Sequence, residues 1–231
     1  MSAQRDLRGD PMPAQRAGVF LRPLGSPLPL GMIALAGASV LLTGQQLSWV
    51  PPGQSHDVAL ALLVFAVPMQ YLASVFGFLS RDGAGGTGMA LLGSCWLVTG
   101  SLLLLAPPGS RSPALGLLLF FASGALLVPA LAAAFGKLAA TLAFLLAAAR
   151  FAVSGAQQYL GGAAWQHAAG WLGLAVCVVA LYNAFAFEIE DTRHHTVLPV
   201  LRWGSGRRAL DGSLPDEVLD VEQEAGVREQ L

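Results

Sequence analysis

Long apolar stretches separated by short polar turns run through most of this chain. Between Arg22 and Glu188 only six residues carry a charge: Asp57, Arg81, Asp82, Arg111, Lys137 and Arg150. An α-helix rises about 1.5 Å per residue and the hydrocarbon core of a bilayer is about 30 Å thick, so about 20 apolar residues cross it. Five of the charge-free runs are at least that long, and only 138–149 is shorter. The pattern predicts an integral membrane protein.

The same pattern predicts six transmembrane helices. We expect them at residues 30–49, 58–80, 86–106, 114–135, 138–160 and 164–187. The expected fold class is therefore all-α: a polytopic integral membrane protein with a polar cytoplasmic C-terminal tail. We expect three parts, namely a cytoplasmic N-terminal tail (1–25), the six-helix membrane domain (26–190) and a largely disordered acidic tail (191–231).

Lysine and arginine residues gather on one side of the expected membrane domain. An even number of helices places both tails on one side, together with the turns that contain Arg81 and Lys137, whereas Arg111 lies on the other side. Cytoplasmic loops carry an excess of lysine and arginine. We therefore expect a multi-pass protein of the inner (plasma) membrane with both termini in the cytoplasm. The N-terminal tail contains no apolar stretch typical of a cleaved signal peptide.

Composition narrows the functional classes. Hydrophobic residues make up 55% of the 231 residues and charged residues 12%. The basic residues form no patch that favours nucleic-acid binding. Cys95 and Cys177 both fall inside apolar helices, at no spacing typical of a disulfide or a metal site. The sequence also lacks the common catalytic motifs, so we expect no enzyme activity, no cofactor and no metal.

Polar residues inside apolar helices are rare and therefore informative. Gln70 lies deep in the second expected helix, just after Pro68, where it is expected to bond a neighbouring helix or to line a pore. Arg150 lies near the middle of the fifth helix, and the neighbouring helices offer no carboxylate to neutralise it. Two interpretations are open: its guanidinium holds a small anion, or it reaches toward the membrane surface or a backbone carbonyl.

Several short motifs, in order along the chain, resemble those of one family of membrane proteins. Residues 26–31 (SPLPLG) resemble the N-P-x-P-L-G signature that opens the acetate uptake transporter family, the succinate–acetate permeases. The matching residues are Ser26, Pro27, Pro29, Leu30 and Gly31. Residues 91–96 (LLGSCW) are similar to a segment of the family's third helix, 169–174 (AGWLGL) to a run in its sixth helix, and 196–200 (TVLPV) to its C-terminal motif.

The resemblance implies a function and an assembly. Members of the family are small homo-oligomeric carriers, typically hexamers with one pore per subunit, that pass acetate and related short carboxylates through the lipid bilayer. For this chain the resemblance implies a transporter or channel for acetate and related carboxylates such as succinate, with or without proton coupling. The implied partners are a small carboxylate, the bilayer and further copies of the chain.

The resemblance also implies site residues. The family's narrowest point is an apolar collar on helices one, three and five, and the matching positions here are Leu35, Leu92 and Leu145. The other residues expected along the substrate path are Gln70, Trp96 and Ala180, which match the family, and Arg150, which its position singles out.

The chain departs from the family pattern at several positions. Ser26 replaces the signature asparagine, Leu35 and Leu92 replace two aromatic residues, and Gly77 stands where a glutamate is often found. The choice of substrate therefore stays open. Two other functions also remain: a six-helix channel for a small neutral solute such as urea or an amide, and a membrane sensor that transports nothing.

Overall fold

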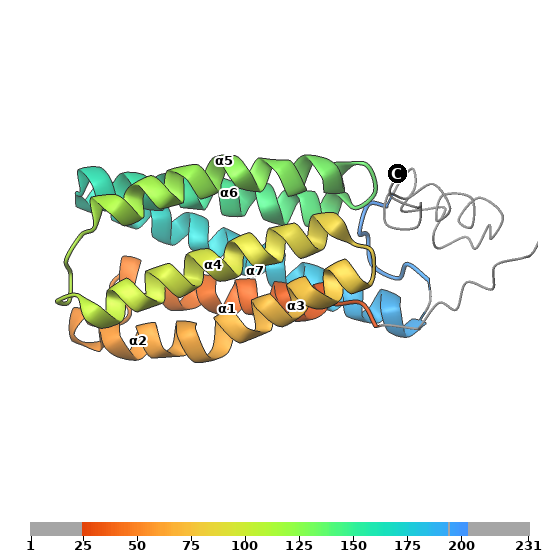
Figure 1. The fold of residues 1–231 in the computed structure, drawn as a ribbon, viewed down its shortest axis with the longest axis horizontal. Coiled ribbons are helices and arrows are strands. Elements are labelled where there is room, and N and C mark those ends of the chain that lie inside the picture. Colours follow the sequence, from red (N-terminus) through yellow and green to blue (C-terminus); the bar gives the residue numbers. More distant parts are fainter. Residues whose placement is uncertain (1–24, 194, 203–231) are drawn as a thin grey trace, which may run out of the picture.

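The computed structural model describes residues 25–193 and 195–202, and its helices form one elongated bundle (Figure 1). In chain order the elements are α1 (Leu28–Gln46), the short 3-10 turn η1 (Pro52–Gln54), α2 (Ser55–Ala61), the π-helical turn η2 (Leu62–Ala66), α3 (Val67–Leu79), α4 (Gly83–Leu105), α5 (Pro113–Ala134), α6 (Leu138–Leu160) and α7 (Ala163–Arg193). The acidic segment from residue 203 onward and the N-terminal tail before residue 25 lie outside the described residues.

Six stretches of the described chain are long and apolar enough to cross a bilayer, which confirms the expected all-α membrane fold. They are Leu28–Gln46, Pro52–Leu79, Gly83–Leu105, Pro113–Ala134, Leu138–Leu160 and Ala163–Arg193. The chain is therefore a multi-pass membrane protein. The sixth span continues beyond the expected end at residue 187 as far as Arg193.

The second span contains a π-helical turn, and Pro68 explains its position. A proline inside a helix lacks an N–H group, and its ring clashes with the carbonyl four residues earlier. That carbonyl belongs to Val64, which lies within η2. The wider π turn gives the proline ring room, so α2, η2 and α3 run on as one membrane span.

Side-chain caps fix the starts of two helices. The carboxylate of Asp82 accepts a hydrogen bond from the backbone N–H of Gly85 (2.9 Å) and caps α4. The hydroxyl of Ser112 accepts one from the N–H of Leu115 (3.2 Å) and caps α5, whose first residue is Pro113. Such caps pair N–H groups that the first helical turn leaves without partners, and a proline suits the first helical position.

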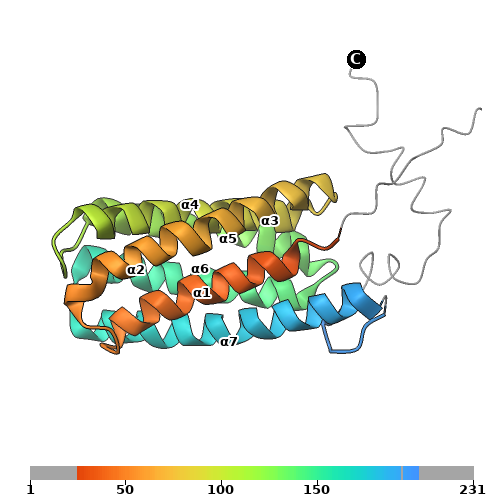
Figure 2. The ribbon, with the colours of Figure 1, turned by 90° about the horizontal axis from the view of Figure 1, so that it is seen from below.

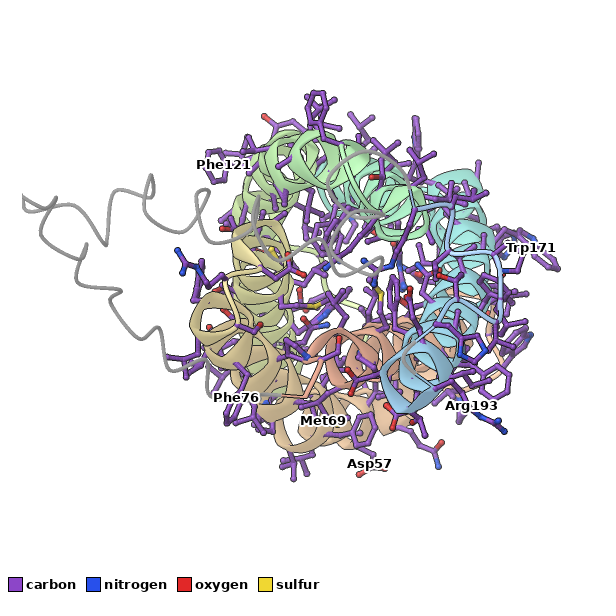
Figure 3. All side chains as sticks on the ribbon, turned by 90° about the vertical axis from the view of Figure 1, so that its right-hand side faces the viewer. Asp57, Met69, Phe76, Phe121, Trp171 and Arg193 are labelled. Atoms are coloured by element: carbon purple, nitrogen blue, oxygen red, sulfur yellow. The ribbon has the colours of Figure 1, made fainter. Side chains whose placement is uncertain are left out.

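The helices pack mainly in three antiparallel pairs: α5 with α6, α1 with α7, and α3 with α4. The two views agree that α1 and α7 lie side by side and that α1 begins at the end of the bundle where α7 finishes, here called the terminal end (Figures 1 and 2). The opposite end carries the α1–α2, α4–α5 and α6–α7 turns and is called the turn end. Viewed along the bundle, Phe76, Phe121 and Trp171 point outward (Figure 3), which suits a surface that faces lipid.

Glycine residues bring two helix pairs into backbone contact. A Cβ atom added to Gly77 would lie 2.9 Å from the backbone N and Cα of Gly86, so α3 and α4 meet without side chains between them. The hydroxyl of Ser74 donates to the Gly86 carbonyl across the same contact (2.8 Å). A Cβ on Gly116 or Gly155 would lie 3.0 Å from the carbonyl oxygen of the other. Small residues of this kind hold membrane helices together, and position 77 has no room for a glutamate.

We expect Gly77→Ala to lower the thermal stability of the protein in detergent, with Gly124→Ala as the matched control. Both substitutions gain about 1 kcal/mol of helix propensity, but only the first adds a methyl group against a backbone, where overpacking costs about 1–3 kcal/mol. Gly124 has open space around its position, with no atom within 4 Å of an added Cβ. Thermal unfolding followed by circular dichroism measures both variants, and a Gly77→Ala midpoint at or above that of Gly124→Ala would contradict the packing described here.

Candidate functional site

A cavity of about 280 Å³ opens at the turn end of the bundle, and we call it the first cavity. Residues from α1, α2, α4, α5, α6 and α7 and from the three turns line it. Its lining includes Gln45, Gln46, Ser55, Trp96, Thr99, Arg111, Leu119, Arg150, Phe151, Gln157, Gln158 and Gln166. The cavity therefore combines polar groups with an apolar part.

Arg150 lies in the lining of this cavity and is buried, with an exposed fraction of 1%. Its Nη2 donates a hydrogen bond to the backbone carbonyl of Ser39 on α1 (3.3 Å). Its Cζ lies 5.9 Å from the centroid of the Trp96 ring, within the range of a cation–π interaction. A Cβ on Gly173 would lie 2.7 Å from the same Cζ, so this glycine leaves space for the guanidinium. Arg150 thus faces the interior of the bundle and does not reach toward lipid.

Five side-chain atoms in the lining are buried without a hydrogen-bond partner among the described residues: Nη1 of Arg150, Nε1 of Trp96, the hydroxyls of Thr99 and Ser55, and Oε1 of Gln46. Trp96 and Thr99 are three residues apart on α4 and therefore share a helix face. The Trp96 ring packs edge-on against Phe151, with 5.1 Å between the ring centroids. The deep part of the first cavity therefore presents N–H and O–H groups beside aromatic rings.

Glutamine side chains surround the mouth of the first cavity. Nε2 of Gln46 donates to Oε1 of Gln157 (3.1 Å), and Nε2 of Gln166 donates to the backbone carbonyl of Gln46 (3.2 Å). Arg111 is exposed in the same lining, and its side chain lies over Gly161, which ends α6 with a φ of 77°. A second positive charge therefore lies at the entrance, which favours the approach of anions.

A second cavity, of about 430 Å³, opens at the terminal end of the bundle. Its lining includes Leu28, Arg81, Asp82, Lys137, Ala140, Phe144 and Arg202. Nζ of Lys137 and Oδ2 of Asp82 form an ion pair at 2.7 Å, which ties the α5–α6 turn to the start of α4. The two cavities therefore approach each other from opposite ends of the bundle.

Four buried apolar residues lie on the terminal side of Arg150 and are here called the apolar segment: Leu35, Leu92, Phe144 and Ala180. Phe144 lines the second cavity and Arg150 the first, and six residues of α6 rise only about 9 Å. Leu35 precedes Ser39 by one helical turn and Leu92 precedes Trp96 by one turn, so both lie on the terminal side of Arg150. All four side chains of the apolar segment are fully buried, with exposed fractions of 0%.

Leu145, which the resemblance places in the collar, does not face the interior of the bundle. Leu145 is 42% exposed and lies on the outside of the bundle, whereas Phe144, one residue earlier, is buried. Successive residues of a helix point about 100° apart, so only one of the two can face the interior. The ring of Phe144 points toward Gly88 of α4, where an added Cβ would meet it.

Gln70 is buried among the helices but lines neither cavity. Its Nε2 donates to the carbonyl of Gly31 (3.1 Å), and its Oε1 has no partner in the described part of the chain. The expected bond between helices is therefore present. Gly31 belongs to the motif of residues 26–31, which lies at the start of α1. In the same motif, the backbone N–H of Ser26 donates a hydrogen bond to Oδ2 of Asp191 on α7 (3.4 Å).

The segment after α7 folds back onto the terminal end of the bundle. Arg202 donates from Nε and Nη2 to the two carboxylate oxygens of Glu190 (2.6 and 2.9 Å). The Tyr182 hydroxyl donates to the carbonyl of Pro199 (3.0 Å), and Val200 is fully buried, with an exposed fraction of 0%. Arg202 also lines the second cavity, so this segment forms part of its rim.

The sequence did not single out several of the residues that the structure brings together. Phe144 lies in the run 138–149, which is apolar on nearly every helix face, and serine and threonine, as at Ser55 and Thr99, are common in membrane helices. The sequence did offer a signal for Gln157 and Gln158. Like Gln45 and Gln46 on α1, they are paired amide side chains near the end of an apolar helix. The described residues contain no group of three or more histidine, cysteine, aspartate or glutamate side chains that could hold a metal ion.

Comparison with known proteins gives a structural likeness. No protein-family model matches the chain, and no curated protein sequence matches it significantly. Among solved structures, the bacterial acetate channel SatP is similar, with a TM-score of 0.69 and 23% sequence identity over 77% of this chain and 99% of the SatP chain. The membrane domain of this chain therefore has the fold of a bacterial acetate channel.

Proposed function

We propose that this chain is a membrane channel or transporter for acetate and related short carboxylates, and that the path runs through the centre of its own helix bundle. The observation that carries the proposal is the pair of cavities on a fold shared with an acetate channel: Phe144 lines one and Arg150 the other, and these two residues of α6 are only about 9 Å of helix rise apart. We place it in the inner membrane with both termini in the cytoplasm, as a homo-oligomer. The hexamer follows from the family resemblance alone.

The charges of the first cavity favour an anion over a neutral solute. Arg111 at the mouth and Arg150 at depth both line this cavity. A neutral amide or urea gains little from two fixed positive charges, whereas a carboxylate pairs well with a guanidinium. Glutamine amides and Trp96 add donors along the same wall.

The apolar segment opposes the passage of a charge. The pKa of a simple carboxylic acid is about 4 to 5, so acetate is almost wholly ionised at neutral pH. An unpaired charge in an apolar region is strongly unfavourable, and a narrow apolar constriction also expels water. Protonation of the substrate before it passes Leu92 and Phe144 removes this barrier, and this step would couple transport to a pH gradient.

Purified protein in liposomes is expected to take up labelled acetate, and an inward pH gradient (acid outside) is expected to accelerate uptake because more of the acid is then neutral. Liposomes without protein correct for direct diffusion of acetic acid through lipid. Uptake of acetamide or urea in place of acetate would favour the neutral-solute function. The absence of protein-dependent acetate and succinate flux, with or without the gradient, would contradict the proposal.

Phe144→Ala and Leu92→Ala are expected to raise acetate flux several-fold or to admit larger carboxylates, because each removes a buried side chain from the apolar segment. Leu145→Ala is the matched control, since it shortens the next side chain on the same helix, which lies outside the bundle. Gel filtration verifies that each variant stays folded. Equal flux and selectivity in all three variants would show that the path does not pass between Phe144 and Leu92.

A further inference from the structure

We propose that the deep end of the first cavity is a binding site for the carboxylate group of a small organic anion, with the guanidinium of Arg150 as its principal ligand and the indole N–H of Trp96 beside it. The choice of a short monocarboxylate as occupant rests on the proposed function. The site itself rests on the geometry of the described residues.

Arg150 is a buried cation without a protein counter-charge. Within the described part of the chain no carboxylate forms an ion pair with it, and the pairs Lys137–Asp82 and Arg202–Glu190 lie at the terminal end of the bundle. Buried charges in proteins are normally paired. An anion in the first cavity would supply the missing charge.

The unpartnered groups around Arg150 match the chemistry of a carboxylate. Arginine and tryptophan side chains only donate hydrogen bonds, whereas an ionised carboxylate only accepts them. Nη1 of Arg150, Nε1 of Trp96 and the hydroxyl of Thr99 are each buried without a partner in the described residues. Two carboxylate oxygens can accept from the guanidinium and the indole N–H together, whereas the NH₂ group of a neutral amide can accept from neither.

The guanidinium is held in place before any ligand arrives. The carbonyl of Ser39 accepts from Nη2, the ring of Trp96 lies beside the cation, and the bare backbone at Gly173 leaves it room. Preorganised donors lose little freedom when an anion binds. Phe151 and Leu119 provide apolar surface in the same lining for the methyl end of the ligand.

The experiment measures equilibrium binding to the purified full chain in lipid nanodiscs by isothermal titration calorimetry, with sodium acetate, acetamide and sodium chloride as separate probes. Acetamide has nearly the shape of acetate without its charge, and chloride has the charge without the two oxygens. Acetate is expected to bind at least about tenfold more tightly than either. Equal affinity for acetamide or chloride would overturn the carboxylate site.

Variants assign the site. Arg150→Gln is expected to reduce acetate affinity about tenfold or more, to the level of acetamide. Arg150→Lys keeps the charge but loses the forked donor geometry, so its acetate affinity should fall by less than that of Arg150→Gln. The acetate affinity of Trp96→Phe should fall several-fold because this variant lacks one N–H donor. Arg193→Gln, which removes an exposed charge at the terminal end (Figure 3), is the matched control and should bind acetate as the unchanged chain does.

The outcomes separate this site from the proposed function. Acetate binding that is lost in Arg150→Gln supports the site even if liposomes show no acetate flux. Acetate flux together with undiminished acetate binding in Arg150→Gln overturns the site alone. If Arg150→Gln does not fold, Arg150→Lys and Trp96→Phe decide, and unchanged acetate affinity in both would overturn the site.

Discussion

The guanidinium of Arg150 lies at the middle of a transmembrane helix, and the packing around it is arranged to hold a charge where charge is unfavourable. A carbonyl of α1, an aromatic ring of α4 and a bare glycine of α7 surround it. These contacts only partly replace water, since one guanidinium nitrogen keeps no partner among the described residues. A cavity with polar and apolar side chains in its lining extends from the arginine to the turn end of the bundle.

Helix α6 connects the two chemical environments of the bundle. Arg150 and Phe151 on its second half face the polar first cavity, and Phe144 on its first half closes the second cavity. In the proposed function, recognition of charge and control of passage would fall on separate turns of this one helix. Glycines at the α3–α4 and α5–α6 contacts bring backbones together, and rigid packing of this kind keeps the distance between the two environments short and fixed.

The sequence predicted the number of helices because a bilayer imposes a length on apolar runs, and it singled out Arg150 because a bilayer penalises isolated charge. It left open whether Arg150 faces the interior or the membrane surface. It could not choose between Phe144 and Leu145, since residues 138–149 are nearly all apolar and leave the rotation of the helix undetermined. The packing role of Gly77 depends on a neighbour, Gly86, that only the fold brings close. The Arg202–Glu190 pair likewise joins residues whose contact requires the chain to turn back after α7.

The most direct test of whether Arg150 binds the anion is the distance between a bound carboxylate and the guanidinium of Arg150. Solid-state NMR with acetate labelled with ¹³C at its carboxyl carbon and protein labelled with ¹⁵N at arginine reports that distance through dipolar coupling. We expect a coupling as strong as that of a directly hydrogen-bonded pair, and its loss in Arg150→Lys. Bound acetate that shows no arginine coupling, or a coupling that persists in Arg150→Lys, would contradict a carboxylate site at Arg150.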